Sequence, residues 1–293
     1  MSGIDEIRII DNGHGIICEN IRNTFGNLGN SEKALTDKTP NGRAIHGRYG
    51  FGRYKALALG SYVQWISNYL DEDQISVFNI KCSINKPNVF NISDKNISGA
   101  SIGVYVSITG IYEKVSGYFS NSDIVLSDLI KHFAAYLLAY PGIEIVVDGL
   151  ELKPYKFIEE EIQNDIFIHT ENKTNPCKIR LIRWKEGSSG RLYLCSEEGV
   201  ALYDMAIGVH LGKLPLSVYI QSKYIEDILQ QNIVPELDTT FSQIHKEVKN
   251  VVRKYYRSWL AVIAAKAMQS LKQENVYREQ VLRPAIGAFS VCA

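Results

Sequence analysis

The chain has 293 residues, 45% of them apolar, and its 32 basic and 32 acidic side chains give a formal net charge of zero. This composition indicates a globular protein of two domains and excludes a single-sign field that would draw the whole chain to nucleic acid or an anionic membrane. The five scattered cysteines without CxxC spacing disfavour a disulfide framework and a zinc site. No apolar stretch is long enough for a membrane span, so we expect a cytoplasmic protein.

The first predicted element is a short strand that ends in a glycine turn. Ile7, Ile9 and Ile10 lead into the turn Asp11-Asn12-Gly13-His14-Gly15. Residues 21–45 predict a short helix and then a long loop of the kind that forms lids. The segment 46–52 is dense in glycine and leads into a helix. A sheet with one buried face is predicted from strand-like runs at 62–68, 75–84 and 102–108.

The second half of the sequence indicates an α+β domain. A helix is predicted over 125–140, followed by a strand over 143–147 and a hairpin turn at Asp148-Gly149. A long amphipathic helix is predicted over 240–273. Further strands are predicted at 178–184, 192–195 and 216–219. We therefore expect a first domain at 1–122, a second domain at 123–275 and a disordered tail at 276–293.

Two glycine-containing segments carry the candidate chemistry. The Asp11 carboxylate stands at a strand end beside glycines that let a flat ring approach the backbone, which suits an exocyclic amine such as that of adenine. The segment 47–52 enters a helix and offers backbone N–H groups and the positive end of a helix dipole to a phosphate. Its glycine spacing differs from that of a Rossmann fold, and no Gly-Lys-Ser or Gly-Lys-Thr of a P-loop follows it.

These two segments, DNGHG and HGRYGFGRYK, resemble the adenine-binding and second glycine motifs of the GHKL ATPases, which include gyrase, the ninety-kilodalton heat-shock chaperone, histidine kinases and MutL. The resemblance implies an α/β sandwich of the Bergerat type, a mixed sheet with helices on one face, followed by an α+β transducer-like domain as in chaperone-like or MutL-like members. It implies ATP and Mg²⁺ as ligands. The nucleotide-binding residues that it implies are Asp11, Gly13, Gly15, Ser31, Lys33, His46, Gly47, Gly50, Phe51, Gly52, Lys55 and Ser101.

Several of these assignments have plainer alternatives. Ser101 stands for a threonine that the family carries on a late strand, and Lys213 for a cation that reaches the terminal phosphate from the second domain. For His46 and Lys213 an ordinary polar surface role is ranked before a phosphate contact, and for Lys55 the two interpretations are balanced. A basic run, Lys246, Lys249, Arg253, Lys254 and Arg257, is interpreted as the solvated face of an amphipathic helix in preference to a nucleic-acid contact.

The sequence also departs from the family pattern. A helix with a general-base Glu and a magnesium-binding Asn normally precedes the first motif, but ten residues before Asp11 are too few for it. We therefore expect ATP binding with slow hydrolysis, in a shortened chain or in a homodimer or complex whose partner supplies the lost elements. The alternative is a catalytically inactive scaffold or interaction module. A histidine kinase catalytic domain would lack the second half.

Overall fold

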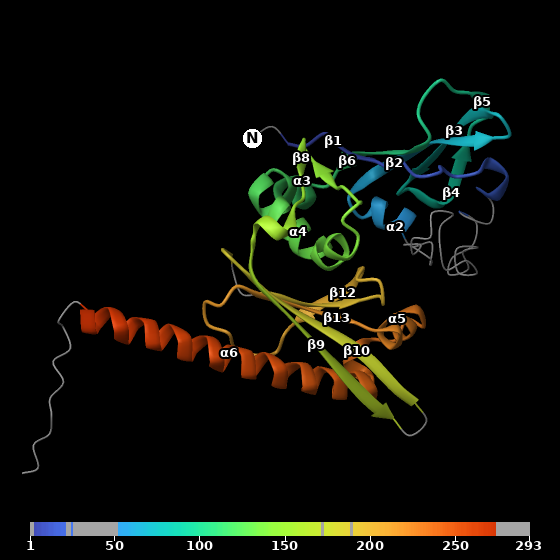
Figure 1. Ribbon diagram of the computed structural model, residues 1–293. Helices are drawn as coiled ribbons and strands as arrows, with labels where there is room; N and C mark the ends of the chain where they lie inside the picture. Colours follow the sequence, from blue (N-terminus) through green and yellow to red (C-terminus); the bar gives the residue numbers. More distant parts are fainter. Residues whose placement is uncertain (1–2, 22–24, 26–51, 171–172, 188–189, 274–293) are drawn as a thin grey trace, which may run out of the picture.

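The computed structural model describes residues 3–21, 25, 52–170, 173–187 and 190–273. The described residues build two large sheets, one from each half of the sequence, with helices packed against them, and a small two-stranded sheet (Figure 1). The elements of the first half are β1 (Glu6–Ile10), η1 (Cys18–Asn20), α2 (Gly52–Leu57), β2 (Gly60–Asp71), β3 (Gln74–Ser83), β4 (Lys86–Ile92), β5 (Asn96–Ile97), β6 (Gly103–Ile111) and α3 (Glu113–Phe119).

The first sheet has the strand order β1-β6-β2-β3-β4, and β5 pairs with β3. Every strand pair described in it is antiparallel. Alternate residues of β2, from Val63 to Tyr69, are buried, while those between them are more exposed. The buried face packs against Ile21, Phe25 and, from α2, Leu57. The helical residues therefore cover one face of this sheet, as period-two alternation requires.

The second half begins with α4 (Ser122–Ala139), whose first turn is capped by the Asn121 side chain, which accepts a hydrogen bond from the Ile124 amide at 3.3 Å. The remaining elements are β7 (Val146–Val147), β8 (Leu150–Glu151), η3 (Pro154–Lys156), β9 (Ile158–Thr170), β10 (Lys173–Trp184), β11 (Arg191–Cys195), β12 (Ala201–Ala206), β13 (Leu216–Gln221), α5 (Lys223–Gln230), η4 (Pro235–Leu237) and α6 (Thr239–Gln273).

The second sheet has the order β12-β11-β13-β10-β9 and contains one parallel pair, β11 with β13. All six residues of β13 are buried, because both faces of the sheet are covered. One face packs on α5 and on the first half of α6, through Phe241, Ile244, Val248 and Val252. The other face packs on α4, and the Tyr219 hydroxyl donates a hydrogen bond to the Lys131 carbonyl oxygen at 2.6 Å.

The expected fold class is confirmed in its outline: a sheet with helices on one face comes first and an α+β part follows it. The expected mixture of parallel and antiparallel strands occurs in the second sheet, whereas the described strand pairs of the first are all antiparallel. The long C-terminal helix begins one residue before the predicted start and ends at the predicted residue. The turn Asp148-Gly149 joins β7 to β8, and both residues have positive φ. We propose a domain boundary at the start of α4, because this helix belongs to the core of the second sheet. The predicted tail lies outside the described residues.

Candidate functional site

The turn at Asp11 follows β1 in the chain and is hydrogen-bonded to the neighbouring strand β6. The Asp11 amide donates to the Val104 carbonyl oxygen at 3.0 Å. Asp11 Oδ1 accepts two hydrogen bonds, from the Gly13 amide at 2.8 Å and from the Val104 amide at 3.3 Å. Within the described part of the chain, Oδ2 has no hydrogen-bond partner, and the residue is exposed. The carboxylate is thus held by one oxygen and offers the other to a donor.

Two glycines let the backbone segments of this turn approach closely. Gly15 has a φ of 74°, and a Cβ on it would collide with the Asn68 carbonyl oxygen of β2. Gly103 has a φ of 146°, and a Cβ there would collide with the Asp11 carbonyl oxygen. A side chain at either position would therefore push the turn away from β2 or β6. Gly15 and Gly103 thus both have a structural reason to be glycine, and the predicted role of Gly15 in the adenine pocket stays a prediction. Gly103 was not singled out from the sequence.

A buried hydroxyl fixes the far end of the turn. Ser67 of β2 is fully buried. Its hydroxyl accepts a hydrogen bond from the Ile16 amide at 2.6 Å and donates one to the Ile16 carbonyl oxygen at 2.9 Å. One side chain thereby satisfies both backbone groups of Ile16. Ser67 lies inside a strand-like apolar run and was not singled out from the sequence.

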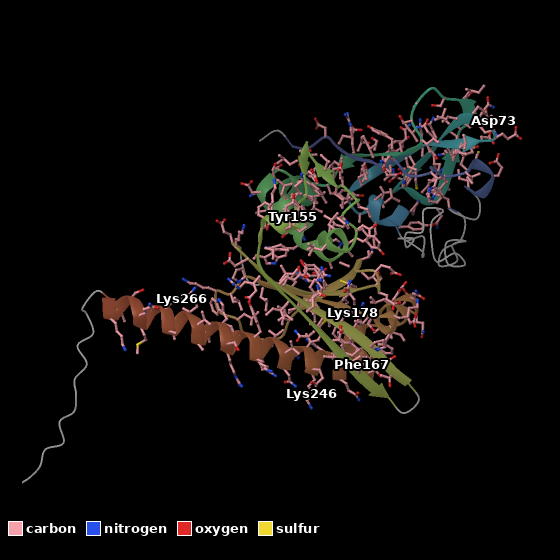
Figure 2. The ribbon with its side chains drawn as sticks, in the orientation of Figure 1. Asp73, Tyr155, Phe167, Lys178, Lys246 and Lys266 are labelled. Atoms are coloured by element: carbon pink, nitrogen blue, oxygen red, sulfur yellow. The ribbon has the colours of Figure 1, made fainter. Side chains whose placement is uncertain are left out.

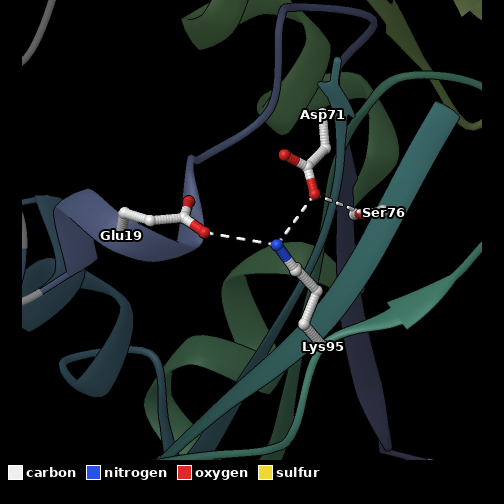
Figure 3. Close-up of polar contacts among 4 residues, drawn as sticks. All are labelled: Glu19, Asp71, Ser76 and Lys95. Carbon is white, nitrogen blue, oxygen red and sulfur yellow. Dashed lines mark hydrogen bonds and ion pairs between the residues drawn. The ribbon is translucent and has the colours of Figure 1, made fainter. Parts of the chain in front are cut away.

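A charged cluster lies beyond the turn, where η1 meets the β2–β3 hairpin (Figure 3). The Lys95 ammonium contacts Glu19 at 3.3 Å and Asp71 at 2.8 Å, and the Ser76 hydroxyl donates to Asp71 at 3.0 Å. The hydrogen bond from Lys95, and then that from Ser76, lowers the pKa of the Asp71 carboxyl. The Asp71 carboxylate in turn raises the pKa of Lys95. This cluster ties the segment that follows the turn to the edge of the sheet.

The other predicted site residues are placed as follows. Gly52 begins α2, and Lys55 is an exposed residue of that helix. Ser101 is exposed in the loop before β6. It is the backbone of Val104, three residues further on, that lies against Asp11. The predicted residues outside the described part of the chain are Ser31, Lys33, His46, Gly47, Gly50 and Phe51.

Lys213 lies on the turn between β12 and β13, far along the chain from the Asp11 turn. It is exposed, while its neighbours Leu211 and Leu214 are buried in the core beneath α6. That core lies on the face of the second sheet opposite to α4. In the described part of the chain, no interaction joins Lys213 to the Asp11 turn. The expected contact with a terminal phosphate thus stays a prediction.

No cluster of three His, Cys, Asp or Glu side chains that could hold a metal ion is found among the described residues. None of the described helices has the length and apolarity needed to cross a bilayer.

The segment that contains this turn matches a known protein family. Residues 2–102 match the family described as "Histidine kinase-, DNA gyrase B-, and HSP90-like ATPase". No curated protein matches the chain in sequence. The chain is similar to the solved MutL ATPase domain of Aquifex aeolicus complexed with ADP, with 12% identity, 78% of this chain and 84% of that chain covered, and a TM-score of 0.38. It is also similar to the N-terminal domain of a DNA repair protein, with 12% identity, 89% and 88% covered, and a TM-score of 0.46.

The family match spans β1, the Asp11 turn, both glycine motifs and the strands up to the start of β6. Residues 2–102 of the 293 therefore match the histidine kinase-, DNA gyrase B- and HSP90-like ATPase family, which is the GHKL type that the two glycine motifs resemble.

Proposed function

We propose that the chain binds ATP with the adenine amino group on Asp11 Oδ2. The observation that carries this proposal is that the two oxygens of the Asp11 carboxylate have different surroundings. Two backbone amides, from Gly13 and Val104, hold Oδ1, and Oδ2 is left as an acceptor at an exposed turn. An exocyclic amine is the donor on the Watson–Crick edge of adenine, whereas guanine carries a carbonyl acceptor at the equivalent place. The site should prefer ATP to GTP.

The second glycine motif, within 47–52, supplies the proposed phosphate end, and this part of the proposal is supported by the sequence motif and the family match. Mg²⁺ would neutralise the phosphates and bridge their oxygens. Lid closure, rearrangement of domains and any hydrolysis are further proposals by resemblance to the family. They involve residues that lie partly outside the described chain.

Replacing Asp11 with asparagine tests the adenine assignment with a change of one atom. The amides of Gly13 and Val104 require an oxygen at the Oδ1 position, so the new NH₂ group takes the place of Oδ2 and faces the adenine amine donor to donor. We expect ATP affinity to fall about tenfold to a hundredfold, which corresponds to about 1.4–2.8 kcal/mol. Affinity for GTP should fall less or rise, because the same NH₂ can donate to its carbonyl.

Titration calorimetry with ATP and GTP measures both expectations. Asp73→Asn makes the same chemical change at the exposed tip of the β2–β3 hairpin and serves as the matched control (Figure 2). Equal ATP affinity in the folded Asp11→Asn variant would refute the adenine assignment. Absence of any ATP binding by the folded parent chain would favour the interaction-module alternative. A phosphate-release assay then measures turnover separately from binding.

A further inference from the structure

The C-terminal helix α6 continues well beyond the fold that it packs on. Its contacts with the second sheet run from Phe241 to Trp259. Residues 260–272 are all exposed, and Figures 1 and 2 show this part of the helix, which carries Lys266, running out past the sheet. At 1.5 Å per residue the exposed part is about 20 Å long. This part continues a helix whose first half is already packed, but its own apolar side chains stay in water, and this favours a partner that covers them.

The exposed part carries an apolar stripe with heptad spacing. Leu260, Ala264, Ala267 and Leu271 follow one another at intervals of four, three and four residues, the spacing of a and d positions in a coiled coil. Leu260 and Leu271 are 42% and 38% exposed. At about 100° per residue, this stripe is turned by roughly a quarter of a turn from the core-facing row that ends at Val252. The row is therefore set apart from the packed face, which itself continues into the exposed part through Val262 and Ile263.

Toward the N-terminus of α6, the residues of the same heptad row are basic or polar instead of apolar. Continuing the spacing backwards from Leu260 gives Arg257, Arg253, Asn250 and Lys246. Three of these four are cations, and a shallow depression on the helix surface is lined by side chains of this region. Residues 248–273 contain six Lys and Arg and no Asp or Glu. One row thus presents a basic half and then an apolar half.

This division argues against pairing with a second copy. A parallel copy in register would set Arg253 and Arg257 against themselves, and like charges at a helix interface are unfavourable. An antiparallel copy would set the basic half against the apolar half and desolvate arginines without partners. The alanines at 264 and 267 favour a helix over a lipid surface, because small side chains add little to membrane insertion but allow two helices to approach closely.

We propose that this row of α6 docks an amphipathic helix of a different protein, whose seam is apolar where it meets residues 260–271 and acidic where it meets residues 246–257. Leucine-type knobs would fill the spaces beside Ala264 and Ala267. Carboxylates would pair with the guanidinium groups of Arg253 and Arg257. The surface is independent of the Asp11 turn, so the proposal stands or falls separately from ATP binding.

Two synthetic four-heptad helices test the proposal against the full chain. Both carry leucine at the a and d positions of two heptads, and the other two heptads carry glutamate there in the probe and lysine in the control. Fluorescence anisotropy should show binding of the glutamate helix alone, weakened by added salt. Leu271→Asp should weaken it by tenfold or more, about 1.4 kcal/mol. Arg253→Glu with Arg257→Glu should transfer the preference to the lysine helix. Gln269→Asp, on the opposite side of α6, should change little.

Several results would overturn the proposal. One is that neither helix binds, or that both bind equally. Another is a dimeric chain by light scattering that Leu271→Asp converts to a monomer, because this would assign the row to a second copy. A third is binding to phosphatidylglycerol vesicles with no binding of the glutamate helix, which would assign it to a lipid surface. All the changed residues are exposed, and circular dichroism verifies that each variant is folded.

Discussion

Ser67→Ala should weaken ATP binding without any contact between Ser67 and the nucleotide. The substitution removes the hydroxyl that bonds both backbone groups of Ile16, at 2.6 and 2.9 Å. Each buried group left without a partner costs about 1–3 kcal/mol, and the half-buried Ile16 regains part of this from water, so we expect a loss of roughly 2–3 kcal/mol in unfolding free energy. The released turn would also no longer hold Asp11 in place, and binding would have to order it again.

The assay combines urea denaturation with an ATP titration on the same preparations. If binding must supply about 1.4 kcal/mol to reorder the turn, the ATP dissociation constant rises about tenfold. Ser76→Ala is the matched control, because Ser76 is a buried serine of the next strand whose hydroxyl bonds Asp71 instead of the turn. It should lose stability with little change in ATP affinity. The reasoning is refuted if Ser67→Ala binds ATP as the parent does, or if both variants lose affinity equally.

Three further predictions concern charge and burial elsewhere. Lys95→Met should lower the melting temperature at pH 7. The difference in melting temperature between variant and parent should narrow below pH 3.8, because the lowered pKa of Asp71 gives stability that is lost as the carboxylate is protonated. A difference that stays constant with pH would contradict this. In His132→Gln the free energy of unfolding should decrease less than in the parent as the pH falls below 6.5. Burial lowers the pKa of His132 in the folded state, so its protonation opposes folding. A pH profile equal to that of the parent would count against this. Ser217→Ala should cost about 1–3 kcal/mol by chemical denaturation, because it leaves the buried Trp184 indole N–H, now 2.9 Å from the hydroxyl, unpaired; a neutral result would mean that another acceptor takes over.

Periodicity in the sequence was sufficient where an element is long and one-sided. The helix ending at Gln273 and the strands β2 and β3 follow their predicted bounds closely, since apolar residues recur at one period over many residues. The strand β9 was missed, because it opens with three glutamates and lies at a sheet edge where polar residues are tolerated. The short helices α3 and α5 offer too few turns for a periodic signal.

The candidate site was only half readable from the sequence. Asp11 and the glycines after it follow from local turn chemistry. The contact between the Val104 backbone amide and Asp11 was not predicted, because a backbone donor leaves no residue-type signal in the sequence. The assignment of Ser101 as the counterpart of a family threonine stays a prediction. Gly103 offered a signal, because a glycine inside a strand can mark a close backbone approach, but its partner depends on strand order. Strand order is a long-range property that no local pattern contains.

During synthesis, β1 leaves the ribosome long before β6, the strand with which it pairs. Asp11 and the Val104 amide that completes its environment are separated by 93 positions. Translation at roughly 5–20 residues per second makes the nascent chain wait about 5–19 s between the two, in addition to the time for β6 to leave the exit tunnel. During that interval the isoleucines of β1 have no strand to pair with, and the carboxylate lacks one of the two amides that fix it. The geometry of the Asp11 turn is therefore completed only after most of the first half of the chain has been synthesised.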